Sequence, residues 1–207
     1  MRDAALAEAS LAAVEIPLRY AQRGLGMAQL ALAGAPRFET WRHYPAGDLR
    51  DPAHGTQCYY HAHGSRRSHP QEHGHFHLFV RAADGHGFHH LAALSLDALG
   101  RPLRWFTTNR WVTGERYVEA ARLLPALEGF RLHARGRLAP LARWLQALVH
   151  LHRPQLAALL HRRDIMLARS AARQGWEASF EDRRLDVLSQ AAIDLPARIA
   201  RVAQGGA

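Results

Sequence analysis

The chain has 207 residues, of which 48 % are hydrophobic and 22 % are charged, as in a globular protein that buries a sizeable core. No apolar run approaches the roughly 20 residues that cross a bilayer, and the single cysteine, Cys58, excludes an internal disulfide framework. We therefore expect one cytoplasmic domain over residues 1–207, with no membrane partner.

The basic charge of the chain comes from arginine alone. The formal net charge is +9, and all 27 basic residues are arginine, a bias typical of GC-rich bacterial genomes. These arginines are scattered from Arg2 to Arg201, and no nucleic-acid-binding motif accompanies them. The pattern favours solubilising arginines on helix faces and argues against a nucleic-acid partner; it does not predict an oligomeric state.

The first elements are predicted from periodicity and turn residues. Apolar residues at helical spacing predict an N-terminal helical segment over 1–34, in which Pro17 divides or starts a helix. The pattern FETWRHY predicts a short strand at 38–44, and the composition of residues 45–48 predicts a turn after it.

The central stretch, residues 58–81, carries six of the 15 histidines. Histidines alternate with apolar residues on both sides of a polar loop over 64–71, as in an antiparallel hairpin with one buried face. Burying both apolar sets against one core would place the other sets on a shared face. That face would carry the residues His61, His63, His73, His75 and His77.

A second hairpin is predicted from strands at 89–96 and 101–111. In its second strand Trp105, Thr107 and Asn109 share one face. The remaining residues, 114–204, are predicted to be helical to the end of the chain, including helices near 184–192 and 195–203. The fold class is therefore α+β: a central antiparallel sheet of four to five strands over about 38–111, an N-terminal helix and a C-terminal helical layer.

Five imidazoles on one patch of sheet point to a metal site. Imidazole is the commonest protein metal ligand, and five cations so close together would be costly, whereas a metal needs the rings neutral. A divalent transition metal, zinc or iron(II), fits this ligand type. One alternative is a polar ligand site without metal. The other is a solvated histidine face that forms no site.

Other residues are assigned to the site by their position near the hairpin. Glu72 precedes the second histidine strand and is the candidate catalytic acid or base. We expect the substrate side to be lined by Tyr59, Trp105, Asn109 and Trp111. Asp48 and Asp51 are predicted to hydrogen-bond their own turns, as turn aspartates usually do.

Several blocks of the chain resemble an uncharacterised bacterial single-domain family of unknown function. The resemblance rests chiefly on EHGHFH at 72–77 and TNRWVTGE at 108–115, and also on HYPAGD, YYHAH and HRRD. It implies that these blocks belong to one domain covering most of the chain, and it implies no reaction. The spacing of His63 and Glu72 does not match the cupin pattern, in which a glutamate follows the HxH closely.

Two classes of function follow from a metal on this hairpin. One is a metal-dependent enzyme, a hydrolase or an oxygenase, in which metal-bound water or dioxygen acts on a small molecule. The other is a non-catalytic metal-binding or sensing protein. An open coordination position in a pocket would favour the first class, and a closed shell of four ligands would favour the second.

Overall fold

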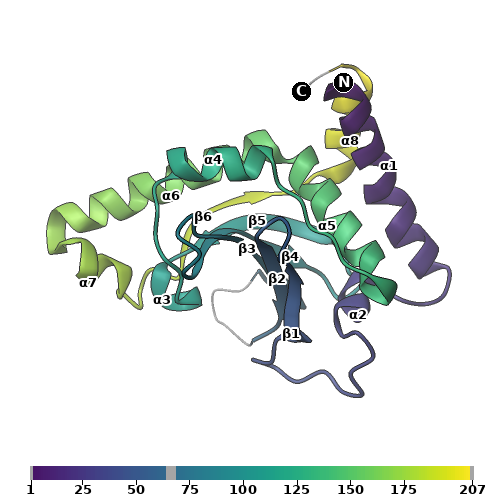
Figure 1. Cartoon of the computed structure of the whole chain (residues 1–207), viewed down its shortest axis with the longest axis horizontal. Helices are drawn as coiled ribbons and strands as arrows, with labels where there is room; N and C mark the ends of the chain where they lie inside the picture. Colours follow the sequence, from purple (N-terminus) through teal and green to yellow (C-terminus); the bar gives the residue numbers. More distant parts are fainter. Residues whose placement is uncertain (1, 64–68, 206–207) are drawn as a thin grey trace.

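An antiparallel sheet covered on one face by helices makes up the protein in the computed structural model, which describes residues 2–63 and 69–205 (Figure 1). Within these residues the sheet has six strands in the order of the chain, each antiparallel to its neighbour. The strands are β1 (Tyr44–Asp51), β2 (Thr56–His61), β3 (Gly74–Arg81), β4 (Phe88–Leu96), β5 (Pro102–Thr108) and β6 (Val187–Ala192).

The helices precede and follow the first five strands. They are α1 (Arg2–Ala21), α2 (Met27–Ala31), α3 (Arg110–Thr113), α4 (Ala120–Glu128), the short 3-10 helix η1 (Gly136–Leu138), α5 (Ala139–Leu151), α6 (Arg153–Gln174), α7 (Trp176–Phe180) and α8 (Leu195–Ala203). None of the helices in the described residues is long and apolar enough to cross a membrane. This arrangement confirms the α+β class, with an N-terminal helix and C-terminal helices around an antiparallel sheet.

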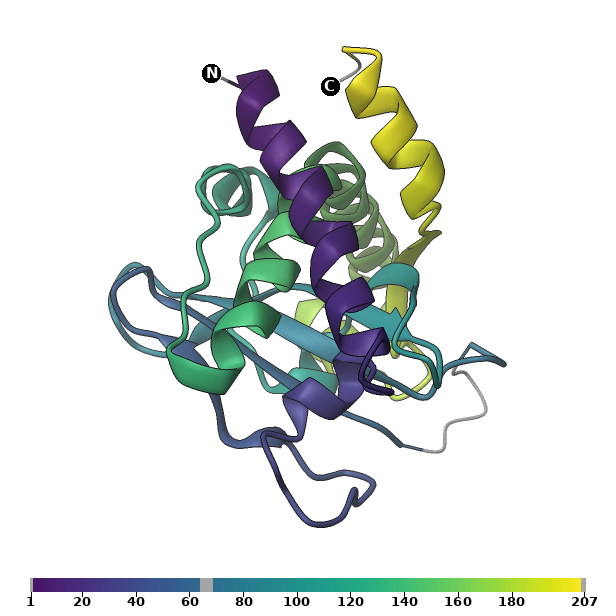
Figure 2. The ribbon, with the colours of Figure 1, turned by 90° about the vertical axis from the view of Figure 1, so that its right-hand side faces the viewer.

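The core lies between the sheet and a layer formed by α1, α4, α5 and α6. These helices stack on the same side of the strands in two views at right angles (Figures 1 and 2). Phe76 and Leu78 of β3 project into this core, where the ring of Phe76 lies 6.4 Å from that of Trp144 on α5. Apolar residues at every second position of a strand therefore bury one face of the sheet, and the other face is left for the intervening residues.

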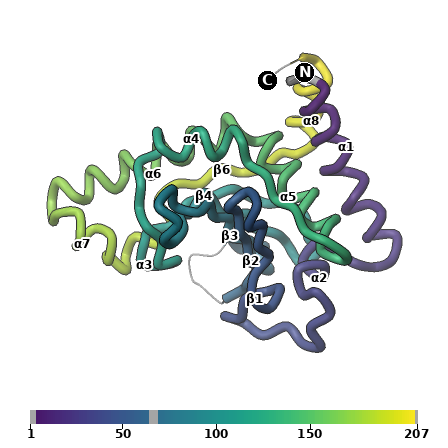
Figure 3. Tube along the Cα trace, in the orientation of Figure 1, coloured from purple at the N-terminus to yellow at the C-terminus, as the bar shows by residue number. Residues whose placement is uncertain are grey.

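The first and last helices lie side by side at one end of the molecule. The Cα trace brings α1, drawn in purple, next to α8, drawn in yellow, and the two helices are in contact (Figure 3). Pro17 lies inside α1 and does not divide it, and the chain turns before α2. Proline has no N–H to donate to the carbonyl four residues earlier, so α1 lacks the hydrogen bond from position 17 to Ala13.

The first strand begins later than predicted. The sequence pattern placed a strand at 38–44 and a turn at 45–48, whereas β1 runs over Tyr44–Asp51 and contains the turn residues. Gly47 and Asp48 have φ values of 80° and 62°, and the pairing with β2 shifts register between Tyr44 and Leu49. The turn-like composition is thus that of a β-bulge inside a strand.

The predicted helix near 184–192 is wrong, because residues 187–192 form β6. This strand pairs with β5, which places Ser189 opposite Thr107. The Ser189 hydroxyl lies 2.7 Å from that of Thr107 and donates to the carbonyl of Leu159 on α6. The sheet thus has six strands instead of four to five, because tertiary pairing of a short segment overrides its local composition.

Candidate metal centre

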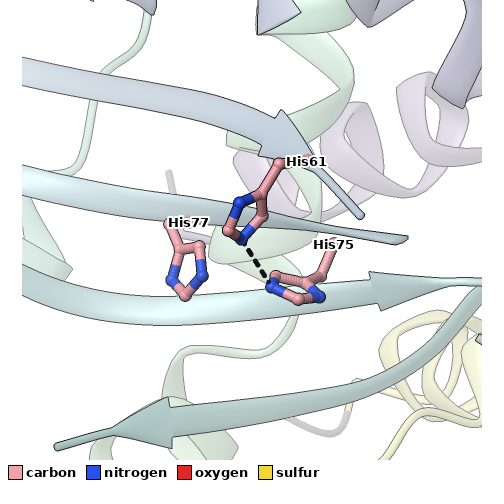
Figure 4. Close-up of side chains that lie close together, drawn as sticks. All are labelled: His61, His75 and His77. Atoms are coloured by element: carbon pink, nitrogen blue, oxygen red, sulfur yellow. Dashed lines mark hydrogen bonds between the residues drawn. The ribbon is translucent and has the colours of Figure 1, made fainter. Parts of the chain in front are cut away.

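The pairing of β2 with β3 brings three histidine rings together on the sheet face opposite the helices. Tyr59 lies opposite His77, and His61 lies opposite His75, while Phe76 between the two histidines of β3 enters the core. The rings of His61, His75 and His77 converge from these neighbouring strands (Figure 4). For these three residues, the predicted shared face is confirmed.

The nitrogens of these rings are close enough to share one ion. One nitrogen from each histidine lies within 4.8 Å of the other two, and Nε2 of His61 lies 2.9 Å from Nε2 of His75. The residues are 8 %, 3 % and 1 % exposed, so little water competes for these atoms. We call His61, His75 and His77 the three-histidine cluster.

A buried carboxylate determines which nitrogen of His75 faces the cluster. Nδ1 of His75 lies 2.6 Å from Oε1 of Glu72, and Oε2 of Glu72 accepts a 3.2 Å hydrogen bond from Nη2 of Arg104. Burial raises the pKa of Glu72, but the hydrogen bonds and charges of His75 and Arg104 outweigh it and leave that pKa below its ordinary value. Because an ionised carboxylate only accepts, Nδ1 of His75 carries the proton and Nε2 offers a lone pair.

A similar relay orients His77. Its Nδ1 lies 3.0 Å from Nε2 of His90, and Nδ1 of His90 lies 3.3 Å from the hydroxyl of Thr108. If each Nδ1 donates along this relay, Nε2 of His77 is left as a lone pair. That atom is buried and has no hydrogen-bond partner among the described residues. A buried acceptor without a donor is costly, and a metal ion would satisfy it.

Burial keeps the rings around the cluster neutral. Desolvation, followed by the charges of neighbouring histidines, lowers the pKa of His61 to about 2. Desolvation also holds the pKa of His77 well below its ordinary value and, with Arg163 nearby, lowers that of His90 to about 3. Neutral imidazole is the form that binds a metal, so the protein presents these ligands without competition from protons at neutral pH.

Tyr59 and His63 border the cluster on the same side. The ring of Tyr59 lies 5.3 Å from those of both His61 and His77. The ring of His63 lies 5.2 Å from that of His61 and stacks on Trp41 at 4.5 Å. Nδ1 of His63 is also buried without a hydrogen-bond partner in the described part of the chain. His63 is therefore the nearest candidate for a fourth ligand.

A crevice of about 40 Å³ opens beside His75 and His77. A volume of this size holds at least one water molecule. Its walls come from β3, β5, the start of β6 and α3, and they consist of His63, Glu72, His75, His77, Arg104, Phe106, Thr108, Val112, Asp186 and Val187. The cluster thus has an open side at His75 and His77.

His73 does not share the face of the cluster, contrary to the expectation from strand parity. Its Nδ1 lies 2.7 Å from the hydroxyl of Tyr60, and its ring packs 5.2 Å from that of Phe38. Tyr60 belongs to the core side of the sheet. The pairing of β2 with β3 ends at His61 and His75, whereas the N–H of His73 donates to the carbonyl of Leu96 on β4, so His73 lies beyond the β2–β3 pairing from which the shared face was predicted. Part of the predicted loop, residues 64–68, lies outside the described residues.

The residues of β5 alternate as predicted, but the set containing Trp105 was assigned to the wrong face of the sheet. Trp105 is fully buried in the helix-side core, and Arg104, Phe106 and Thr108 face the crevice instead. Asn109 caps α3 and donates to the carbonyl of Ser179, and the indole of Trp111 donates to that of Leu185. Neither Asn109 nor Trp111 is among the crevice residues.

Arg104, Thr108 and His90 are the site residues that sequence reasoning missed. The apolar residues Leu103 and Trp105 signal which face of β5 is buried, and reading them as core places Arg104 on the polar face. Nothing in the sequence signals the part played by His90, because it depends on a bulge in β4, which places Leu91 between the pairs Leu78–Ala92 and Phe79–His90.

A second group with metal-binding residue types has a structural explanation. Asp51, His54 and His133 lie together, but the Asp51 carboxylate already accepts from Nδ1 of His54 at 2.8 Å and from the His133 backbone N–H at 2.8 Å. These bonds join the β1–β2 turn to the segment after α4. Asp51 thus hydrogen-bonds its own turn as predicted, whereas Asp48 accepts from Gln57 on β2.

A large apolar hollow lies away from the histidines. A groove of about 890 Å³ runs between α1, the start of α2, α8 and the β4–β5 turn, with apolar side chains such as Val14, Leu18 and Leu99 along it. None of the histidines in the described residues lines this groove. The chemistry of the site is therefore confined to the other face of the sheet.

The chain belongs to the family described as domain of unknown function DUF6969, whose model matches residues 7–193. This match agrees with the resemblance inferred from the EHGHFH and TNRWVTGE blocks, and it covers all six strands. No curated protein and no solved structure matches the chain.

Proposed function

We propose that the protein binds one divalent transition metal ion through His61, His75 and His77 and uses it to transform a small molecule. The observation that carries this proposal is Nε2 of His77, which is buried without a partner among the described residues and belongs to a ring 5.1 Å from that of His61 and 4.8 Å from that of His75. A bound metal ion would satisfy this atom.

Metal-activated water is the chemistry that this ligand set supports best. Catalytic zinc sites keep three protein ligands and one open position, whereas the iron(II) sites of many oxygenases include a carboxylate ligand. The cluster contains three imidazoles, and its nearest carboxylate, Glu72, is engaged by Nδ1 of His75 and by Arg104. Zinc in this position would lower the pKa of a bound water in the crevice.

Glu72 acts in this proposal as a positioning residue. Both of its carboxylate oxygens are occupied, one by His75 and one by Arg104. A carboxylate behind a ligating histidine fixes the ring and raises its basicity. The acid or base role predicted from the sequence would require Glu72 to release one of these partners.

A non-catalytic metal-binding protein is the competing function, and His63 favours it. A fourth imidazole could close the shell, since Nδ1 of His63 is buried and unpartnered in the described residues and its ring lies 5.1 Å from that of His75. The crevice between His63 and Arg104 argues for the open site.

The metal content of the protein tests the proposal. We expect about one equivalent of zinc in untagged protein. We expect His75→Ala to lose this zinc, because the substitution removes one ligand and leaves the Glu72 carboxylate without its partner ring. His73→Ala is the matched control, since His73 belongs to the same HxH run but faces Tyr60. Equal metal content in the two variants, or none in the unaltered protein, would contradict the proposal.

A further inference from the structure

Arg104 has a buried donor that no described residue accepts. Its Nη1 donates to Oε1 of Gln190 and its Nη2 to Oε2 of Glu72, and its guanidinium lies 4.8 Å from the ring centroid of Phe106. The residue is 8 % exposed, yet its Nε is buried without a hydrogen-bond partner in the described part of the chain. Burying a guanidinium N–H without an acceptor is costly.

A second unpaired donor lies beside Arg104 on the neighbouring strand. Ser95 of β4 is opposite His75 on one side and opposite Arg104 on the other, so the three side chains share the face of the cluster. The Ser95 hydroxyl is buried and, among the described residues, has no partner. Two adjacent donors without acceptors, next to a crevice, indicate a ligand that brings acceptors.

The charges around the crevice favour an anion once a metal is bound. A bound metal ion would add two positive charges to the site, and the charges of Glu72 and Arg104 offset each other. Asp186 also lines the crevice and accepts from the N–H of Val187. An anionic group beside the metal would offset part of its charge.

We propose that the small molecule taken by this site carries a carboxylate, and that Arg104 binds this group beside the metal. A carboxylate is planar, matches the hydrogen-bonding geometry of arginine and fits the small volume beside His75. This inference rests on the proposed function, because the metal supplies the charge that the anion offsets. Arg104 would then set the orientation of the substrate.

Calorimetric titration of the zinc-loaded full chain with acetate tests this inference. We expect acetate to bind and acetamide, which has the same shape without the charge, to bind at least about tenfold more weakly. Arg104→Lys keeps a positive charge opposite Glu72 but removes the planar Nε donor, so it should weaken acetate binding about tenfold or more at unchanged zinc content. Arg101→Lys is the control, because Arg101 is 73 % exposed and pairs with Asp97.

The outcomes separate this inference from the metal proposal. Equal acetate affinity in Arg104→Lys and in the unaltered protein, with zinc retained in both, would overturn the role of Arg104. Tighter binding of inorganic phosphate than of acetate would overturn the carboxylate. If the protein holds no zinc, the proposed function fails by itself, and the same titration of the metal-free chain decides whether Arg104 still binds acetate.

Discussion

At the scale of single residues, the site is organised by the partners behind its ligands. Glu72 accepts a hydrogen bond from Nδ1 of His75. Nδ1 of His77 contacts His90, which in turn contacts the hydroxyl of Thr108. Glu72 fixes the proton of His75 on Nδ1, and the contact between Nδ1 of His77 and His90 leaves Nε2 of His77 without a partner among the described residues. The arrangement resembles the histidine and second-partner pairs that tune metal sites in general.

Replacing Glu72 with glutamine tests this dependence. The amide oxygen can still accept from Nδ1 of His75, but it carries no charge, so the ring becomes a weaker ligand. We expect Glu72→Gln to retain its fold and to bind zinc about 10- to 100-fold more weakly, measured by competition with a chelator. Glu39→Gln, in an exposed ion pair with Arg42, is the control. Unchanged affinity in Glu72→Gln would remove the carboxylate from the site.

At the scale of elements, the junction of α5 and α6 contains a buried histidine. His152 is 4 % exposed, and its Nδ1 lies 2.8 Å from Oε1 of Gln155, while its Nε2 has no partner in the described residues. Burial, and to a smaller extent the charges of Arg198 and Arg201, lower the pKa of His152 to about 4. The ring is thus neutral in the folded protein at pH values where the unfolded chain already protonates it.

This histidine should make the stability of the protein depend on pH. Between the ordinary value of 6.5 and about 4, the unfolded state binds the extra proton, so the free energy of unfolding falls as the pH falls through this window. Below this pH window, the free energy of unfolding is lower by about 3 kcal/mol in total because of His152. We would measure the free energy of unfolding of chelator-treated protein in urea at pH 7 and at pH 4.5. This free energy should fall less between the two pH values in His152→Gln than in the exposed control His86→Gln. Equal differences would contradict the assignment.

The elements that the sequence predicted best are those with strict alternation over several residues. At the end of β2 and in the first half of β3, histidines alternate with Tyr60, Phe76 and Leu78, and the predicted face holds for His61, His75 and His77. The prediction failed at His73, where the pairing ends, and at Trp105, whose large apolar ring was read as a substrate contact. The face occupied by a residue at a strand end or by an aromatic residue is hard to predict, because the alternation of side chains along a strand does not say which partner each side chain contacts.

The elements that were missed depend on contacts between distant segments. β6 pairs with β5 across more than 80 residues, as in the bond between Thr107 and Ser189. The residues of β1 include a glycine and an aspartate with positive φ, which indicate a turn unless the neighbouring strand is known. Arg104 and His90 join the site for the same reason, since their partners come from other strands.

At the scale of the whole molecule, the two faces of the sheet differ: one packs in the hydrophobic core, and the other carries the candidate metal site. One face packs on α1, α4, α5 and α6 and carries Tyr60, Phe76 and Trp105, and the other carries the three-histidine cluster (Figure 1). Residues of the second face are nonetheless buried, because the rings, Tyr59 and Phe106 cover one another. Substitutions on this face should therefore alter metal binding more than folding, apart from the direct loss of packing.

X-ray absorption spectroscopy of the zinc-loaded protein tests the central claim, that one metal ion is held by three imidazoles of the sheet. We predict a first shell of three nitrogen atoms at about 2.0–2.1 Å with the multiple-scattering pattern of imidazole, plus one oxygen ligand. His75→Ala, which we expect to lose its zinc on purification, should show one imidazole fewer when zinc is added back in excess, and His73→Ala should show all three. A shell composed mainly of oxygen atoms, or a pattern that is the same in His75→Ala as in the unaltered protein, would contradict the account.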